Sequence, residues 1–234
     1  METNSRFKDC QIPVTDEISV SGVVGIPEWW PTGSRVGVVL AHDAATNLEQ
    51  EFLVTLHRAL ADAGYLSLRF NFPFAQAGKH RPDGPALLER SFRAAVASLL
   101  PDPQNAPSRI VLGGFGLGAR VASELVAQGA KTDGLVLMNF PLHPAGKPSR
   151  QRADALFRLA TPLLFVQGTK DPTCRVDRLQ ALVRKIGAPH EVRVLNDADH
   201  LFQPARGSPR TREEVHGEAI GAVTKFLAKV ARSL

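Results

Sequence analysis

The stretch Arg109-Ile110-Val111-Leu112-Gly113-Gly114-Phe115-Gly116-Leu117-Gly118 decides the fold of this chain. Its apolar first half predicts a strand, and a helical pattern begins at Leu117 and continues to Ala127. The glycines between them predict a tight turn, because glycine adopts backbone conformations that side chains disfavour. A strand, a sharp turn and a helix in this order are typical of the Gly-x-Ser-x-Gly elbow that exposes a nucleophile. Gly116 stands at the central position, so the turn is predicted and the serine side chain is missing.

The order of elements outside this stretch predicts the fold class. From about residue 35 onward, short β-rich runs alternate with amphipathic segments, which is typical of an α/β protein with a mainly parallel sheet and helices on both faces. Before that, two alternating runs around a Thr-Asp pair predict an N-terminal antiparallel hairpin at the sheet edge. A single domain, 1–234, is expected. The other expected strands are 11–14, 18–26, 36–41, 65–70, 135–140, 163–166 and 191–195. The expected helices are 48–63, 87–100, 117–127, one from about 153, 176–186 and 213–234, with a long loop over 71–85.

Composition narrows the class of protein. With 44% hydrophobic and 22% charged residues, the 234-residue chain is typical of a globular protein. No apolar run approaches the ~20 residues of a membrane span, so we expect neither a secretory signal nor an anchor, and a cytoplasmic protein. The two cysteines, Cys10 and Cys174, are too few for a disulfide framework and lack metal-ligand spacing. No metal and no cofactor are therefore expected. Cys174 is only a remote candidate nucleophile.

The charge pattern indicates the kind of partner. The formal net charge is +5, but the basic residues are spread among acids, whereas a nucleic-acid binder concentrates them in a run or stripe. Neither nucleic acid nor a membrane is expected as a partner. A denser basic region either frames a pocket for a small anionic ligand or is a solvated surface. It comprises residues 79–81 and, further along, His143, Lys147, Arg150 and Arg152. The oligomeric state is left open.

Two loops supply an acid and a base in the chain order of serine hydrolases. The strand at 163–166 runs into Gln167-Gly168-Thr169-Lys170-Asp171-Pro172, and the strand at 191–195 runs into Asn196-Asp197-Ala198-Asp199-His200. In that chemistry an aspartate orients a histidine, which acts as general base, and each lies on the loop after its own strand. Taken alone, Asp171 is equally well a turn residue and His200 a loop histidine. Together with the elbow, their order favours an acid–base pair.

The chain resembles the small α/β-hydrolases of the dienelactone-hydrolase-like group from Val36 to Leu227. The resemblance rests on several blocks that are weak singly and specific together. They are Val38-Val39-Leu40-Ala41-His42, Arg69-Phe70-Asn71-Phe72-Pro73-Phe74, Lys79-His80-Arg81-Pro82-Asp83, Gly113-Gly114, Gly118-Ala119-Arg120-Val121-Ala122-Ser123, Pro141-Leu142-His143-Pro144-Ala145-Gly146-Lys147-Pro148, Gln167-Gly168-Thr169-Lys170-Asp171-Pro172 and Asp197-Ala198-Asp199-His200.

This resemblance implies an α/β-hydrolase fold and a serine hydrolase, with Asp171 and His200 as acid and base. It implies the Leu117 N–H as an oxyanion-hole donor. Two positions depart from the family pattern: Gly116 replaces the serine, and Asp43 replaces a glycine that helps to form the oxyanion hole. A carboxylate at position 43 would repel a developing oxyanion unless it points away or is neutralised. The residues assigned to the substrate pocket are His42, Arg81, His143 and Lys147.

Four functions remain open from the sequence. The first is a hydrolase in which the His200–Asp171 pair activates a water or takes a substrate proton without an acyl-enzyme. There Asp43 either adds a second carboxylate or, as we expect, caps the helix beginning at Leu48. The second is an inactive ligand-binding or regulatory protein, and the third an esterase whose serine was substituted by glycine. The fourth is dinucleotide binding, since residues 114–119 match Gly-x-Gly-x-x-Ala, although the following strand ends in Asn139 rather than an acid.

Overall fold

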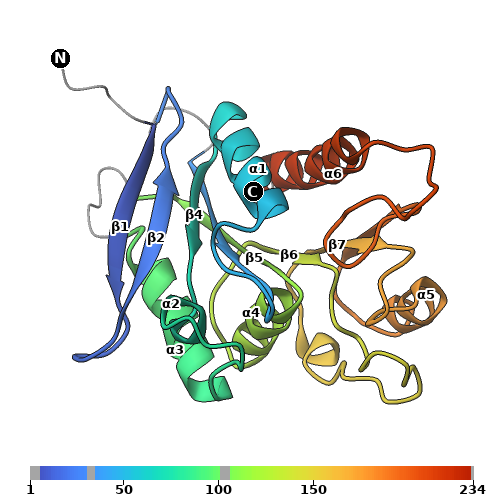
Figure 1. Cartoon of the computed structure of the whole chain (residues 1–234). Coiled ribbons are helices and arrows are strands. Elements are labelled where there is room, and N and C mark those ends of the chain that lie inside the picture. The colour runs from blue at the N-terminus through green and yellow to red at the C-terminus, as the bar shows by residue number, and fades with distance from the viewer. Residues whose placement is uncertain (1–5, 31–34, 101–105, 233–234) are drawn as a thin grey trace.

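The computed structural model describes residues 6–30, 35–100 and 106–232. Their strands form one eight-stranded sheet in the order β1-β2-β4-β3-β5-β6-β7-β8 (Figure 1). From β4 to β8 across the sheet, neighbouring strands are parallel. β1 and β2 form an antiparallel hairpin, and β2 is also antiparallel to β4. The predicted α/β class and edge hairpin are therefore confirmed. The strands are β1 (Phe7–Pro13), β2 (Ser19–Gly25), β3 (Val36–Ala41), β4 (Leu66–Phe70), β5 (Arg109–Phe115), β6 (Gly134–Met138), β7 (Leu163–Gly168) and β8 (His190–Leu195).

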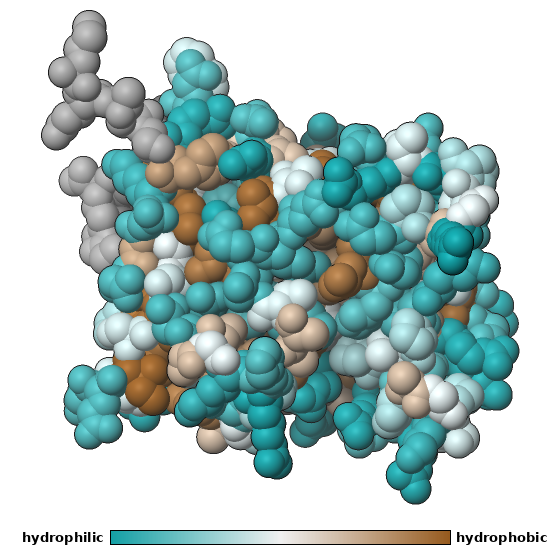
Figure 2. Space-filling model, viewed as in Figure 1, coloured by the Kyte–Doolittle hydropathy of each residue, from teal (hydrophilic) through white to brown (hydrophobic). Residues whose placement is uncertain are grey.

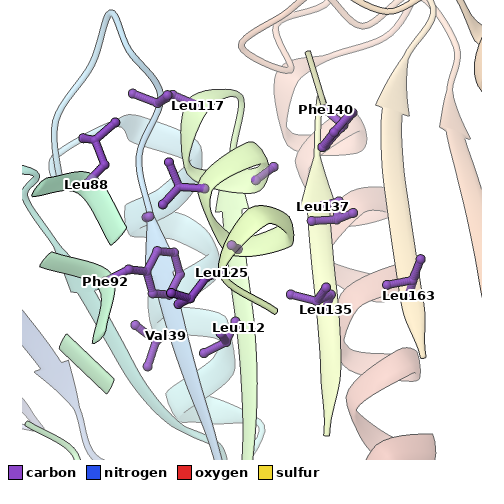
Figure 3. Close-up of a cluster of buried hydrophobic side chains, with 14 of the residues drawn as sticks. Val39, Leu88, Phe92, Leu112, Leu117, Leu125, Leu135, Leu137, Phe140 and Leu163 are labelled. Atoms are coloured by element: carbon purple, nitrogen blue, oxygen red, sulfur yellow. The ribbon is translucent and has the colours of Figure 1, made fainter. Parts of the chain in front are cut away.

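Helices cover both faces of the sheet because successive strand residues point to opposite sides. Val39 and Leu112 belong to the core under α3, α4 and α5, whereas their neighbours Val38 and Val111 belong to the core under α1 and α6. Figure 3 shows Phe92 of α3 close to Val39 on the first of these faces. The helices are α1 (Glu51–Asp62), α2 (Pro73–Gln76), α3 (Pro85–Ala97), α4 (Leu117–Ala127), α5 (Val176–Val183) and α6 (Arg212–Arg232).

Two segments differ from their sequence predictions in the kind of element they form. The loop expected over 71–85 contains α2, because Pro73 occupies a first-turn position and the Asp83 carboxylate accepts a hydrogen bond from Phe74 N at 2.7 Å. The helix expected from about residue 153 is reduced to one 3₁₀ turn, Leu156–Arg158. Pro162 restricts the preceding residue to extended conformations, which limits the length of any helix there.

The outer surface and the helices can be examined for apolar character. On the face shown in Figure 2 the surface is largely hydrophilic, and its apolar residues lie in small separate spots. Within the described residues, no helix is both long enough and apolar enough to cross a bilayer.

The chain reverses its direction across the sheet at β3. β4 pairs with one side of β3 and β5 with the other, so the loops after β3 and β5 lie side by side at the carboxyl edge of the strands. Ligands of open α/β sheets bind in the crevice at such a point. The loops after β6, β7 and β8 reach the same edge, which brings residues from five strands together.

Candidate active site

The turn between β5 and α4 is tight and packs against the loop after β3. Gly116 has φ 52° and ψ −110°, a conformation that side chains rarely adopt. Its N–H donates to the Met138 carbonyl at 2.9 Å, and Gly118 N–H donates to the His42 carbonyl at 3.1 Å. A Cβ at Gly118 would overlap the Ala41 carbonyl. Close packing against β3 therefore accounts for the glycine at 118.

The Asp43 carboxylate occupies the space beside Gly116. A Cβ built at Gly116 would overlap Asp43 Oδ1, so these two positions compete for one volume. Oδ1 accepts a hydrogen bond from Leu117 N–H at 2.7 Å. This N–H is the predicted oxyanion-hole donor, and it is already engaged. Burial raises the pKa of Asp43, but His200 and the Leu117 N–H outweigh burial and hold the pKa below its usual value.

The prediction that Asp43 caps the helix beginning near Leu48 is wrong. That helix, α1, begins at Glu51 after Gln50, and no side chain caps it. Asp43 instead satisfies the first N–H of α4, because β3 and β5 are neighbours in register, with Ala41 opposite Gly114. A carboxylate is favourable at this end of a helix, where unpaired N–H groups and the helix dipole present positive charge.

His200 lies between two carboxylates. Its Nε2 is 3.4 Å from Asp43 Oδ2, and its Nδ1 is 3.0 Å from Asp171 Oδ1 in an ion pair. Burial alone lowers the pKa of His200, but hydrogen bonding to Asp171 and Asp43, and the charges of both, raise it to about 10. The imidazole is therefore protonated at neutral pH. In this state His200 can donate a proton but cannot accept one.

Asp171 is buried and tied to its own loop. Its Oδ1 accepts hydrogen bonds from the Thr173 N–H and hydroxyl, each at 2.8 Å, and its Oδ2 accepts one from Gln167 Nε2 at 2.9 Å. Burial raises the pKa of Asp171, but these donors and His200 lower it further than burial raises it. The carboxylate is therefore charged and fixed in orientation, as a group that positions an imidazole must be.

Asn139, directly after β6, connects the loop of Asp171 to the loop of His200. Its Oδ1 accepts hydrogen bonds from Gln167 Nε2 and Gly168 N–H, both at 2.9 Å. Its Nδ2 donates to the carbonyls of Asp199 at 3.0 Å and His200 at 2.8 Å. In the sequence, Asn139 is notable only as the position where a dinucleotide-binding protein would have an acid for the ribose. An asparagine directly after a strand, where a left-handed conformation (φ 43°) is needed, is the signal that indicates its structural role.

Both histidines assigned to the substrate pocket are engaged with backbone groups. His42 is fully buried: Nε2 accepts from Phe72 N–H at 3.0 Å, and Nδ1 lies 2.7 Å from the Asp43 carbonyl. Burial lowers the pKa of His42 to about 4. His143 Nε2 accepts from Arg175 N–H at 3.1 Å, and its Nδ1 lies 3.1 Å from the Pro144 carbonyl. In this structure both rings hold loops in place.

The basic residues assigned to the pocket lie on exposed loops. Arg81 follows α2 and Lys147 follows β6. Beside the Asp43 loop is a pocket of about 200 Å³, lined by residues 44–47 and by Ala75, Gly78, Lys79 and His80. Cys174 is buried, and burial and Asp171 raise the pKa of its thiol, which disfavours a thiolate nucleophile. Among the described residues, no group of three or more His, Cys, Asp or Glu side chains is arranged to hold a metal ion.

The family is decided by a match over most of the chain. Residues 34–228 match the model of a family described as an alpha/beta hydrolase domain. The chain belongs to the alpha/beta hydrolase family. This alpha/beta hydrolase is also 24% identical over 164 residues to RP471, an uncharacterized protein of Rickettsia prowazekii (strain Madrid E). The match covers 67% of this chain and 66% of that relative.

Solved structures support the same fold. An alpha-beta serine hydrolase homologue from Coxiella burnetii is 22% identical, with a TM-score of 0.71 and 98% of both chains covered. A dienelactone hydrolase-like promiscuous phosphotriesterase from metagenomic libraries is 21% identical, with a TM-score of 0.72 over 97% of this chain and 99% of that one. Dienelactone hydrolase from Anabaena variabilis is 18% identical, with a TM-score of 0.68 over 96% and 97%. At these identities the similarity establishes the fold alone, and the predicted α/β-hydrolase fold is confirmed.

Proposed function

We propose that this alpha/beta hydrolase cleaves a small neutral substrate with water and without a serine acyl-enzyme. The observation that carries this proposal is the position of His200 between Asp171 and Asp43, with Asp43 in the space beside Gly116. The reactive centre is then Asp43–His200–Asp171. The description of the matched family as an alpha/beta hydrolase domain supports hydrolysis as the reaction class.

The geometry disfavours ordinary acyl transfer. That chemistry needs a nucleophile at the turn and a free N–H for the oxyanion. Position 116 carries no side chain, and Leu117 N–H is bonded to Asp43. His200 is protonated in the resting site, so it enters the reaction as a proton donor and becomes a base only after giving its proton away. Direct water activation by a resting His200–Asp171 pair is disfavoured for the same reason.

An inactive ligand-binding protein is the second candidate. One observation favours it: several polar groups of the site are already bonded to each other, including Asp43 to Leu117 N–H and Asp171 to Gln167. Dinucleotide binding is disfavoured, because the N-terminus of α4, where a pyrophosphate would bind, faces the Asp43 carboxylate. Two anions cannot share that position favourably.

Turnover by matched histidine variants tests the proposal. The substrates are p-nitrophenyl acetate and styrene oxide, incubated with the unmodified chain, His200→Gln and the control His190→Gln. His190 lies exposed at the start of β8, at the opposite edge of the sheet from the site. Loss of an acid–base group lowers rates by ~100 to 10,000-fold, so we expect that loss for His200→Gln and no change for the control.

The two candidate functions give different results. Turnover of either substrate that requires His200 supports the hydrolase. If the unmodified chain turns over neither substrate and calorimetry shows saturable binding of at least one of them, the inactive ligand-binding function is supported. Equal turnover by the unmodified chain and His200→Gln would place the chemistry outside this site and overturn the proposal.

A further inference from the structure

One oxygen of Asp43 is held and the other is weakly engaged. Oδ1 is fixed by the 2.7 Å hydrogen bond from Leu117 N–H. Oδ2 lies farther from its neighbours, 3.4 Å from His200 Nε2 and 3.5 Å from Ala45 N, and the Ala44 N–H is a further donor to the carboxylate. Solvent reaches both side chains, since Asp43 is 11% and His200 24% exposed. A carboxylate held firmly at one oxygen and more weakly at the other, in a side chain that solvent partly reaches, has the arrangement of a nucleophile.

We infer that Asp43 is the covalent nucleophile of this site and that its substrate is a small neutral epoxide. This inference rests on the proposed function and goes further by naming the attacking atom, Asp43 Oδ2, and the substrate class. In other enzymes a carboxylate can act as a nucleophile and form a covalent intermediate. Such an intermediate replaces one difficult step by two easier ones. The position beside Gly116 gives Asp43 the place that an elbow side chain would take.

The charges and hydrogen bonds of the site select the substrate class. Two carboxylates and one imidazolium leave a net negative charge, which disfavours an anionic substrate. Attack on an ester carbonyl would create an oxyanion, and the Leu117 N–H that would stabilise it is bonded to Oδ1. Attack on the saturated carbon of an epoxide creates no oxyanion at that carbon. The opening ring oxygen needs one proton, and His200 carries one.

In the first step, Oδ2 of Asp43 forms a bond to an epoxide carbon as the carbon–oxygen bond of the ring breaks. The electron pair of that bond goes to the ring oxygen, which takes the proton from His200 Nε2. The products are a hydroxyalkyl ester on Asp43 and a neutral imidazole. Because the ester carries no charge, His200 loses one of its two anionic partners, which favours the neutral form needed next.

In the second step, neutral His200 takes a proton from water and the hydroxide attacks Cγ of Asp43. Negative charge develops on Oδ1, where the Leu117 N–H already points, so the contact that blocks acyl transfer stabilises this intermediate. The alkoxide leaves with the proton from His200, giving a diol. The carboxyl group of Asp43 returns its proton to His200, so the site is regenerated, and the net reaction is epoxide plus water to diol.

Oxygen-18-labelled water tests the inference in a single turnover with enzyme in excess. The probes are styrene oxide, cyclohexene oxide and propylene oxide. In the first turnover, water oxygen should enter the Asp43 carboxyl group and be absent from the diol, measured by mass spectrometry of the peptide containing Asp43. Asp43→Asn keeps the oxygen that accepts the Leu117 N–H and should form no diol while remaining folded by circular dichroism. Asp16→Asn, in the exposed hairpin turn, is the matched control and should behave as the unmodified chain.

The outcomes separate this inference from the proposed function. Labelled diol with unlabelled Asp43, from turnover that requires His200, means direct attack by water and overturns only the inference. The inference alone is also overturned if none of the three epoxides reacts while p-nitrophenyl acetate is hydrolysed in a reaction that requires His200. Absence of all turnover, for epoxides and ester alike, overturns both.

Discussion

The effect of a serine at position 116 on stability and esterase activity should depend on whether Asp43 is present. In Gly116→Ser, the new Cβ overlaps Asp43 Oδ1, so the carboxylate must leave Leu117 N–H and move relative to His200. Loss of a hydrogen bond to a charged group costs ~1.5 to 3 kcal/mol, and unpairing a buried ion costs ~3 to 5 kcal/mol. Since the Asp43 side chain keeps 11% exposure, we expect about 3 kcal/mol of lost stability. For a chain of this size that lowers Tm by roughly 6 to 12 °C.

The double variant Asp43→Gly/Gly116→Ser removes the overlap. The serine then fits, Leu117 N–H becomes free as a donor, and Asp171–His200 remains. A freed oxyanion donor is worth ~100 to 1000-fold in rate, so the double variant should hydrolyse p-nitrophenyl acetate at least about 100-fold faster than Gly116→Ser. It should also recover part of the lost Tm. Gly116→Ser combined with Asp16→Gly is the control and should recover neither.

Esterase rates and thermal unfolding of these variants test whether Asp43 occupies the space beside position 116. If Gly116→Ser alone is as stable and as active as the double variant, Asp43 does not occupy the space beside position 116. Equal loss in both variants would show that serine at the φ 52° turn is itself the source of the strain, and would refute overlap with Asp43 as its cause.

The groups that hold the site give three further expectations. Asn139→Leu removes hydrogen bonds to two loops, so it should lower the free energy of unfolding in urea by ~2 to 4 kcal/mol and abolish turnover that depends on His200. A decrease below about 1 kcal/mol would contradict this. Because the folded-state pKa of His200, about 10, exceeds the ordinary 6.5, its stabilisation is complete below pH 6.5 and is lost as the pH rises to 10. Unfolding free energies should fall by at most ~5 kcal/mol over that range, and His200→Gln should flatten the profile. His42→Leu leaves Phe72 N–H unpaired and should cost ~1 to 3 kcal/mol, measured as a lower Tm; an unchanged Tm would show that another group satisfies that N–H.

Periodicity and turn chemistry were enough to predict most of the fold. β3 and α4 have the predicted bounds, because a continuous apolar run and a helical repeat beginning directly after a glycine leave little ambiguity. The boundaries of α1 were less accurate: it ends near the predicted stop at Gly64 (φ 88°), but begins at Glu51 rather than Leu48. No side-chain cap marks that beginning, so the sequence carried no local signal for it.

The candidate site was only partly predictable. Asp171 and His200 could be located because each follows its own strand in the expected order. The contact of Asp43 with Leu117 N–H joins positions 74 residues apart and depends on β3 and β5 being neighbours, which no local pattern encodes. The bonds from Asn139 to the loop of His200 span 60 and 61 residues and depend in the same way on strand order.

The titration of His200 tests most directly whether Asp43, His200 and Asp171 form one unit. Nitrogen-15 NMR of labelled histidines, with the His200 signal assigned by its loss in His200→Gln, gives the pKa of that ring. We expect an imidazolium that persists through neutral pH, with a pKa of about 10 in the unmodified chain and a lower pKa in Asp43→Asn. A pKa near 6.5 in both proteins would contradict the pairing of His200 with Asp43.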